Sequence, residues 1–342
     1  MTGLLSRLRG PELVAHFQRW CGLYPLSGDN SAQRRFPEAD SKSPHCLSGA
    51  RSQAQWKEQV KTETNGALIG IAVVMYIGQA SKDVLRWPRP PSPPVVKLEV
   101  RVDAEYGMPS THAMAASAIP FTFLLATMNR YKYPFELGLL FAVTICTLVS
   151  LSRIYTGMHT VLDVLCGIAI TALLVTVSYP FWDAIENFQM KNRFAPLLAL
   201  TLSFLLSINY PELDHWSTAR GDTTNIVSAG GGAAIATWIN YQWDLLPEPL
   251  SAPPYEIPLL SPELIGRMGA RFTIGIVIVF FARQAIKSMA LAFVCKLAGV
   301  SPGDQQARKL LWVEVPYKYI TYSCLGVVGL ALCPAVHRYL SL

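Results

Sequence analysis

Residues 152–181 read SRIYTGMHTVLDVLCGIAITALLVTVSYPF and join a polar cluster to an apolar run. The run begins at Val161 and has the roughly 20 residues that an α-helix needs to cross a bilayer. Near its start the stretch carries the polar and ionisable side chains of Ser152, Arg153, His159 and Asp163. Because such side chains are costly at the edge of lipid, they are expected there for chemistry. The stretch therefore predicts a membrane helix with a reactive site at its start.

The spacing of His159 and Asp163 predicts how these two side chains act. They are four residues apart, so on a helix they would share one face. The carboxylate would then accept the proton of one ring nitrogen and leave the other nitrogen free as a nucleophile. Arg153 could add a planar fork that holds phosphate oxygens. The alternative is an interfacial His–Asp hydrogen bond that only holds the start of the helix.

The rest of the chain has the composition of a membrane protein. Of its 342 residues, 51% are hydrophobic and 15% are charged, against about 25% charged in soluble domains. Eight apolar segments approach the length of a spanning helix, at about 67–81, 113–128, 135–151, 161–181, 195–208, 225–243, 272–297 and 320–336. The expected fold class is therefore all-α, a polytopic membrane helical bundle with about eight transmembrane helices. Three adjacent glycines at 230–232 favour close helix contact in lipid.

Polar stretches divide the chain into three parts. Residues 1–65 are expected to form a polar, partly disordered tail without the apolar core of a cleavable signal. Its amphipathic stretch 1–24 would lie on a membrane surface or dock as a small helix. Residues 66–182 are expected to form the catalytic membrane core. Residues 183–342 would hold the remaining helices and a proline-rich loop at 244–271.

The charges and cysteines exclude several other classes. The formal charge of +6 lies in loops between apolar segments, which favours anionic lipid headgroups and membrane topology as its cause. No basic run with interleaved aromatic residues indicates a nucleic-acid partner. The seven cysteines are scattered without a Cys-x-x-Cys pair, so neither a disulfide framework nor a zinc site is expected.

Two further polar clusters precede the opening stretch. Lys82 ends the first apolar segment, where its long side chain can reach the interface, and Arg89 follows in the proline-stiffened sequence RWPRPPSPP. Both cations suit a phosphate, or they merely set topology. Ser110 is a natural N-cap for the second segment, whose helix start would attract anions. His112 could donate a proton to a leaving alkoxide, or be no more than polar trim.

Counting segments places all three clusters on one side of the membrane. The first two clusters precede the segment at 113–128, and the third follows the segment at 135–151. The chain therefore crosses and returns between them. The short connection at 129–134 makes these two helices antiparallel neighbours. A single site at one membrane face follows from this arrangement.

The clusters resemble the signature of the type 2 phosphatidic acid phosphatase superfamily, which has the parts K-x6-R-P, P-S-x-H and S-R-x5-H-x3-D. The chain matches the first part with Lys82 and Arg89-Pro90 and the second with Pro109-Ser110-Thr111-His112. It matches the third with Ser152-Arg153, His159 and Asp163. Three motifs in order with correct spacing are far more specific than one short pattern.

Within the superfamily the chain most resembles the sphingosine-1-phosphate phosphatases. Most relatives carry Gly in the second motif, whereas the sphingoid-base phosphatases carry the Thr found here at Thr111. The sequences RWPRPPSPPVVKLEV, SRIYTGMHTVLDVL, STARGDT and EVPYKYITY are also similar. The sequence MYIGQASKDVL and the terminal HRYL favour the second of the two mammalian-type isoforms, although DHWSTARGDT looks more like the first.

The resemblance implies a role for each site residue. His159 would attack phosphorus, Asp163 would orient His159, and His112 would protonate the departing lipid alkoxide. The phosphate would be held by the remaining residues of the motifs, namely Lys82, Arg89, Ser110, Thr111, Ser152 and Arg153. No metal or other cofactor is implied, because cations and a helix start supply the charge stabilisation. The implied substrate is a sphingoid-base phosphate lipid; the sequence says nothing of the oligomeric state.

The resemblance also implies a multi-pass protein of the endoplasmic reticulum membrane with a lumen-facing site. One departure stands out: relatives usually carry another apolar span before the one that holds the first motif, and here residues 44–65 are polar. Two alternatives follow. The chain could be a phosphatase for other lipid phosphates, or a catalytically impaired short isoform that acts as a binding or regulatory membrane protein.

Overall fold

The computed structural model describes residues 2–23, 65–99, 105–213, 215–243, 245 and 254–342. All eight apolar segments predicted from the sequence lie in helices, and the expected all-α class is confirmed. The helices of the bundle are α3 (Asn65–Leu85), α4 (Thr111–Thr127), α5 (Phe135–Tyr155), α6 (Val161–Ser178), α7 (Trp182–Lys191), α8 (Ala195–Ile208), α9 (Ala219–Gln242), α10 (Pro262–Ala298), α11 (Leu311–Val327) and α12 (Cys333–Tyr339).

Shorter elements join or flank these helices. A 3-10 turn (Tyr179–Phe181) links α6 to α7, a second one (Ala307–Lys309) precedes α11, and a π-helical turn (Val328–Leu332) links α11 to α12. The strands β1 (Tyr131–Lys132) and β2 (Tyr255–Glu256) form one short parallel pair. Two small helices, α1 (Thr2–Arg9) and α2 (Pro11–Trp20), precede the bundle.

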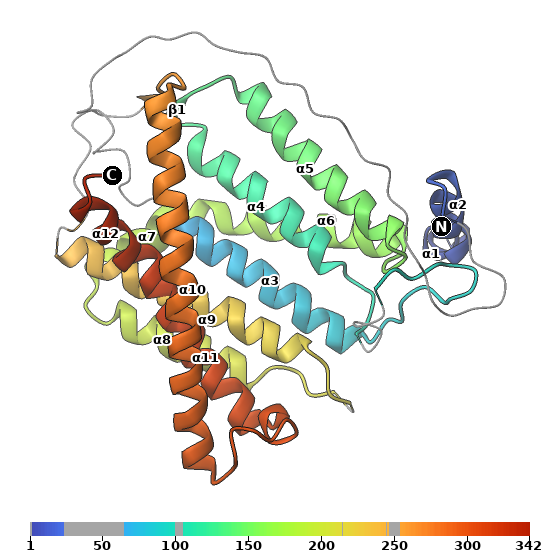
Figure 1. Ribbon diagram of the computed structural model, residues 1–342. Coiled ribbons are helices and arrows are strands. Elements are labelled where there is room, and N and C mark those ends of the chain that lie inside the picture. Colours follow the sequence, from blue (N-terminus) through green and yellow to red (C-terminus); the bar gives the residue numbers. More distant parts are fainter. Residues whose placement is uncertain (1, 24–64, 100–104, 214, 244, 246–253) are drawn as a thin grey trace.

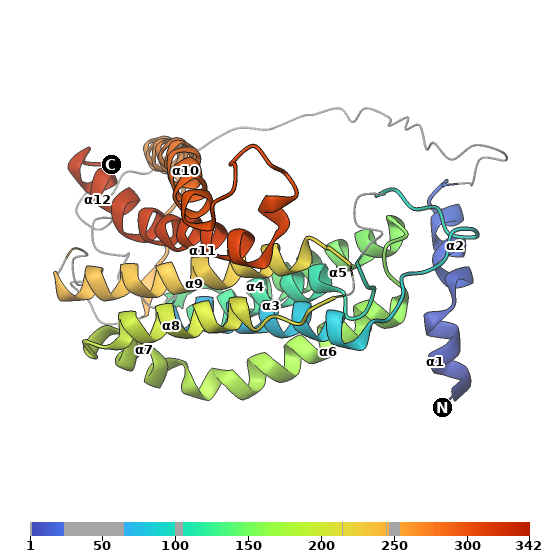
Figure 2. The same cartoon turned by 90° about the horizontal axis from the view of Figure 1, so that it is seen from below.

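Helix α3 lies in the middle of the bundle (Figure 1). It contacts α4 and α6 on one side and α9 on the other; α4 contacts α5, and α9 contacts α8 and α11. The long helix α10 contacts α11 and lies at the edge of the bundle (Figure 2). The catalytic core predicted at 66–182 therefore packs on the C-terminal helices mainly through α3 and α9.

Five helical stretches of the described chain are long and apolar enough to cross a membrane, and the chain is a multi-pass membrane protein. They are Gly66–Leu85, Phe135–Tyr155, Val161–Lys191, Pro262–Ala298 and Leu311–Tyr339. Helices α4 and α8 are apolar but shorter. The expected number of eight spanning helices is therefore not established, although each of the eight segments is helical.

The proline-rich loop is shorter than the predicted 244–271. Helix α10 already begins at Pro262, where the side chain of Ser261 accepts a hydrogen bond from the Leu264 backbone N–H and proline occupies the first turn. Ser followed by Pro is a strong start signal for a helix. The glycines and arginines at 266–271 hide this start because they interrupt the apolar pattern.

Each of the three adjacent glycines of α9 faces a different helix. A Cβ atom at Gly230 would lie 3.3 Å from Ala72 of α3, and one at Gly231 would lie 2.7 Å from the Ser203 hydroxyl of α8. A Cβ atom at Gly232 would run into the carbonyl of Ser323 in α11. The close helix contact predicted from these glycines is confirmed. Helix α9 is therefore the central helix of the C-terminal half, packed against α3, α8 and α11.

The N-terminal helices α1 and α2 lie at one end of the bundle and run across its helix axes (Figure 2). In α2, Val14 and Ala15 are buried in one cluster with residues of the core. The side chain of Gln18 donates to the carbonyls of Val96 (2.7 Å) and Tyr155 (2.8 Å) and accepts from the Val96 N–H (3.0 Å). Of the two expectations for residues 1–24, docking is therefore observed for α2.

Candidate active site

The two cations of the first motif lie at the end of α3 and in the segment that follows it. The Lys82 side chain is 2% exposed and the Arg89 side chain 6%. The Arg89 guanidinium donates to the Glu105 carbonyl (2.9 Å) and to the Met158 carbonyl (2.9 Å). The second of these bonds ties the first motif to the residue that precedes His159.

A carboxylate that the motif analysis missed lies between these cations. Glu105 Oε2 lies 2.8 Å from Lys82 Nζ and 3.5 Å from Arg89 Nη2, and Glu105 Oε1 accepts a hydrogen bond from the Thr218 hydroxyl (2.7 Å). Burial alone would raise the pKa of this carboxyl, but Lys82, Thr218 and Arg89 together lower its pKa below the usual value. Glu105 is therefore a carboxylate inside the first motif's cation pair.

The second motif starts helix α4. The Ser110 hydroxyl accepts a hydrogen bond from the Ala113 N–H (3.5 Å), so the predicted N-cap is confirmed. The Ser110 backbone N–H donates to the Asp163 carbonyl (3.1 Å), which joins the second motif to the third. Thr111 is buried, and its methyl carbon lies close to Gly78, one helical turn before Lys82. His112, by contrast, is exposed.

The third motif differs in one respect from the sequence prediction. His159 does not share a helix with Asp163, because Thr160 is the N-cap of α6 and the helix begins at Val161. The carboxylate of Asp163 accepts from the Thr160 backbone N–H (2.7 Å) in a capping box, in which the Thr160 hydroxyl accepts from the Asp163 N–H. The sequence T-V-L-D carries this capping signal, so Asp163 both starts the helix and faces the histidine.

The His159–Asp163 pair is close but not hydrogen-bonded. The Nδ1 atom of His159 lies 3.9 Å from Asp163 Oδ2, which is longer than a hydrogen bond. Within the described part of the chain, His159 Nδ1 and Asp163 Oδ1 have no hydrogen-bond partner. Both side chains are buried, at 3% and 0% exposure. The His159 ring nitrogen and one oxygen of the Asp163 carboxylate thus keep their hydrogen-bonding capacity.

Ser152 and Arg153 end helix α5 beside this pair. The Ser152 hydroxyl donates to the Val149 carbonyl (2.7 Å) and accepts from Arg153 Nε (3.3 Å). The chain then turns at Gly157, whose φ of +68° suits glycine, and returns to His159. A Cβ atom at Gly157 would meet the carbonyl of Val96, so this turn also packs against the segment that follows Arg89.

The charges around His159 act in one direction. Burial, followed by the positive charges of Arg89, Lys82 and His112, holds the pKa of the His159 imidazole well below its usual value; a backbone hydrogen bond to Gly107 opposes this shift only in part. The ring is therefore neutral at physiological pH. A neutral imidazole can act as a nucleophile towards the phosphorus of a bound phosphate ester. The nearby cations and helix N-terminus can stabilise the charge on the phosphate oxygens.

The structure thus brings the three motifs to one end of α3, α4, α5 and α6. Hydrogen bonds join the first motif to the third at Met158 and the second to the third at Asp163. The expectation that the clusters face one side is confirmed. Sequence reasoning missed Glu105 and Thr218, because neither belongs to a motif and 113 residues separate them.

The chain is similar to known lipid phosphatases. The PAP2 superfamily profile matches residues 64–186. Over its full length and that of each relative, the chain is 41% identical to sphingosine-1-phosphate phosphatase 2 of Mus musculus and 48% identical to sphingosine-1-phosphate phosphatase 2 of Homo sapiens. It is 42% identical to sphingosine-1-phosphate phosphatase 1 of Rattus norvegicus over 79% of this chain and 63% of that one.

No solved structure matches the chain. The full-length matches favour the second isoform over the first, as the sequence predicted. The three motifs all lie inside the matched PAP2 region. The chain therefore belongs to the sphingosine-1-phosphate phosphatase family, within the PAP2 superfamily.

Proposed function

We propose that this chain hydrolyses sphingoid-base 1-phosphates, with sphingosine 1-phosphate as the principal substrate, to the sphingoid base and inorganic phosphate. The observation that carries the proposal is the buried, neutral His159, which feels the charges of Arg89 and Lys82 and lies at the end of the bundle where all three motifs meet. Family membership supplies the substrate class.

In the proposed first step, a ring nitrogen of His159 attacks phosphorus while the bond between phosphorus and the lipid oxygen breaks. Lys82, Arg89 and Arg153 stabilise the charge on the phosphoryl oxygens, together with the N-terminus of α4 at Ser110 and Thr111. Ser152 supports Arg153 through the hydrogen bond between them. The exposed His112 donates a proton to the departing alkoxide.

In the second step, water attacks the phosphohistidine and the P–N bond breaks. His112, now neutral, accepts the proton of the water, and inorganic phosphate leaves. In the first step the His159 ring becomes positive, and the Asp163 carboxylate accepts a hydrogen bond from its Nδ1–H; when the P–N bond breaks in the second step, the ring is neutral again. Catalytic hydrogen bonds that are long in the free enzyme commonly tighten when substrate binds. Both steps use only residues of this chain, the lipid phosphate and water.

The proposed location is the endoplasmic reticulum membrane with the catalytic end in the lumen. The connection between α4 and α5 and the one between α7 and α8 lie at the opposite end of the bundle. They carry the basic residues Arg130, Lys132, Lys191 and Arg193. Basic loops favour the cytosolic side, which supports a lumenal position for the motifs.

The test is phosphate release from sphingosine 1-phosphate by membranes that contain the chain. We expect His159→Ala to reduce release by at least about 10³-fold and His112→Ala by about 10² to 10⁴-fold, while the exposed His16→Ala keeps the wild-type rate. A substrate labelled in its phosphate should leave base-stable, acid-labile label on the wild type and none on His159→Ala. Normal turnover by His159→Ala would overturn the mechanism.

The same assay tests the substrate. Sphingosine 1-phosphate and its dihydro and phyto analogues are compared with phosphatidic and lysophosphatidic acid at equal surface concentration. A higher kcat/KM for the glycerolipids would show a general lipid phosphate phosphatase instead. Binding of labelled sphingosine 1-phosphate without release of phosphate would show a chain that binds but does not turn over.

A further inference from the structure

The position of Glu105 is unexpected for a phosphate site. Its carboxylate lies 2.8 Å from Lys82 and 3.5 Å from Arg89, the two cations that the proposed function assigns to the substrate. A carboxylate beside a phosphate site repels the negatively charged substrate. Its presence there is explained if it holds the neighbouring cations in place. The Lys82 side chain is 2% exposed, and a buried ammonium without a partner is strongly destabilising. Glu105 supplies that partner.

Glu105 is itself held from the other half of the chain. Its second oxygen accepts the hydrogen bond of Thr218 (2.7 Å), the residue that precedes helix α9. One oxygen thus points to Lys82 and the other to Thr218. With both oxygens engaged, the carboxylate has a single orientation, and that orientation fixes the Lys82 ammonium.

A second contact joins the same two regions. In the connection between α8 and α9, the Tyr210 hydroxyl lies 2.6 Å from Asp83 Oδ2 and 3.1 Å from the Gln79 carbonyl. Asp83 is the neighbour of Lys82 in sequence. Tyr210 and Thr218 therefore connect this part of the chain to the end of α3 at two points, Asp83 directly and Lys82 through Glu105.

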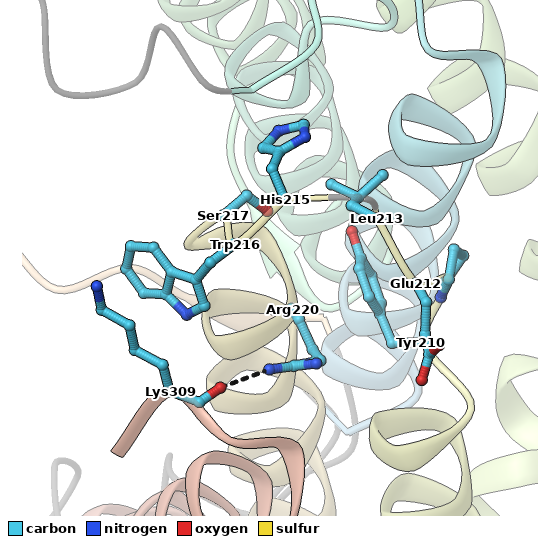
Figure 3. A pocket seen from close by; sticks show the side chains of 9 residues that line it. Tyr210, Glu212, Leu213, His215, Trp216, Ser217, Arg220 and Lys309 are labelled. Carbon is cyan, nitrogen blue, oxygen red and sulfur yellow. Dashed lines mark hydrogen bonds between the residues drawn. The ribbon is translucent and has the colours of Figure 1, made fainter. Parts of the chain in front are cut away.

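The other side of this connection is open. Tyr210, His215 and Trp216 line a cavity of about 330 Å³ together with Arg220 and Lys309, and Figure 3 shows Tyr210 on one wall with Arg220 and Lys309 on another. Arg220 is held by the Lys309 carbonyl (3.1 Å) and by Glu314 (2.9 Å). Across this cavity Lys309 Nζ lies 4.6 Å from the centre of the Trp216 ring. The connection is therefore held by a ring contact on this side, and by the hydrogen bonds of Tyr210 and Thr218 on the side of α3 and Glu105.

We propose that Glu105 is a positioning residue for Lys82 and Arg89, and that Thr218 fixes the Glu105 carboxylate, so that the α8–α9 connection forms part of the phosphate site. The inference rests on the proposed function, which assigns both cations to the phosphate. It extends the site from the matched PAP2 region at 64–186 to the C-terminal half.

The test changes the tether and leaves the cations in place. Thr218→Val keeps the shape of the side chain and removes the hydroxyl, and Thr218→Ser restores the hydroxyl. Thr224→Val is the matched control, because the Thr224 hydroxyl bonds to the Arg220 carbonyl inside the same helix. The probe is orthovanadate, a phosphate-like oxyanion that reports on the cations without turnover; its dissociation constant is obtained from the rise in melting temperature of the detergent-solubilised chain.

We expect Thr218→Val to weaken orthovanadate binding and kcat/KM for sphingosine 1-phosphate by about tenfold, the effect of one hydrogen bond to a charged group. Thr218→Ser should recover most of both, and Thr224→Val should change neither. Glu105→Gln should weaken both more than Thr218→Val does. Unchanged orthovanadate binding in Thr218→Val, or no recovery in Thr218→Ser, would overturn the inference.

The two proposals can fail separately. If the wild type binds orthovanadate but releases no phosphate from sphingosine 1-phosphate, the proposed function fails while the binding comparison still tests the tether. If the wild type hydrolyses the lipid and all threonine variants match it, the proposed function stands and the positioning role of Glu105 is wrong.

Discussion

At the residue scale, His159 owes its properties to side chains that are distant in sequence. Lys82 and Arg89 lie about 70 positions earlier in the chain, yet with burial they hold the pKa of the imidazole well below its usual value. Spacing within a motif cannot reveal this effect, because it depends on how α3 and the segment after it pack against the turn at Met158.

The lowered pKa predicts how stability depends on pH. The unfolded chain takes up a proton on this imidazole near its ordinary pKa of about 6.5, whereas the folded ring stays neutral to lower pH. The unfolded state therefore binds more protons below pH 6.5, and the free energy of unfolding falls there by at most about 1.4 kcal/mol per pH unit. Above pH 6.5 the group has no effect.

The melting temperature of the wild type in detergent should fall between about pH 7.5 and pH 5.5. We expect this fall to be smaller in His159→Gln than in the wild type. His16→Gln, at an exposed position of α2, is the control and should lose as much as the wild type. An equal loss in all three chains would show that His159 is not the group that titrates.

The residues of the site were predicted unevenly. Each motif residue could be located from spacing alone, and the N-cap at Ser110 was found because capping is a local signal. Glu105 and Thr218 were missed because their contact depends on the packing of α3 against α9. The start of α6 at Val161 was predicted from the apolar run, but the capping box at Thr160 was missed, and with it the position of His159 outside the helix.

At the element scale, α9 shows how three small residues organise one half of the bundle. Its three adjacent glycines face α3, α8 and α11 in turn. On the other side of the α9–α11 contact, Gly326 of α11 lies close to the Ala229 carbonyl of α9. Because an added side chain on either helix would have to push the backbones apart, the separation of α9 and α11 is set by glycine. The sequence predicted the contact but not its partners.

This packing predicts opposite effects for two similar substitutions. Gly232→Ala places a methyl group against the Ser323 carbonyl, so it should lower the free energy of unfolding by about 1–3 kcal/mol through overpacking. Gly266→Ala in α10 meets nothing within 4 Å and should stabilise its helix by about 0.5–1 kcal/mol. Melting temperatures of the two variants in detergent check the signs; equal shifts would contradict the packing argument.

At the scale of the whole molecule, the extent of the helices follows from composition and their arrangement does not. The eight apolar segments all lie in helices, because hydrophobic length is a property of the sequence itself. The central place of α3, the peripheral place of α10 and the docking of α2 depend on side-chain fit between distant segments (Figure 1). Only the shared side of the three motifs could be deduced, by counting crossings.

The docking of α2 has a consequence for how the chain threads through a membrane. Gln18 holds α2 at the end of the bundle where the three motifs meet, beside Tyr155, whereas α3 starts at the other end, where Gly66 approaches Trp182. The sequence between them, 24–64, carries charged residues from Asp29 to Glu63 and no apolar run. Drawing those charges through a bilayer is costly, so docking of α2 and insertion of α3 as the first span compete.

Tags read out this competition. In sealed membranes, we expect an N-terminal epitope to be accessible from the same side as an epitope between α4 and α5, which lies at the end of the bundle opposite the three motifs; α2 then does not reach its docking site. An apolar span of about 20 residues inserted before Asn65 should move the N-terminal epitope across, let α2 dock and raise the rate of phosphate release. If the N-terminal epitope already shares the catalytic side without that span, the threading conflict does not exist.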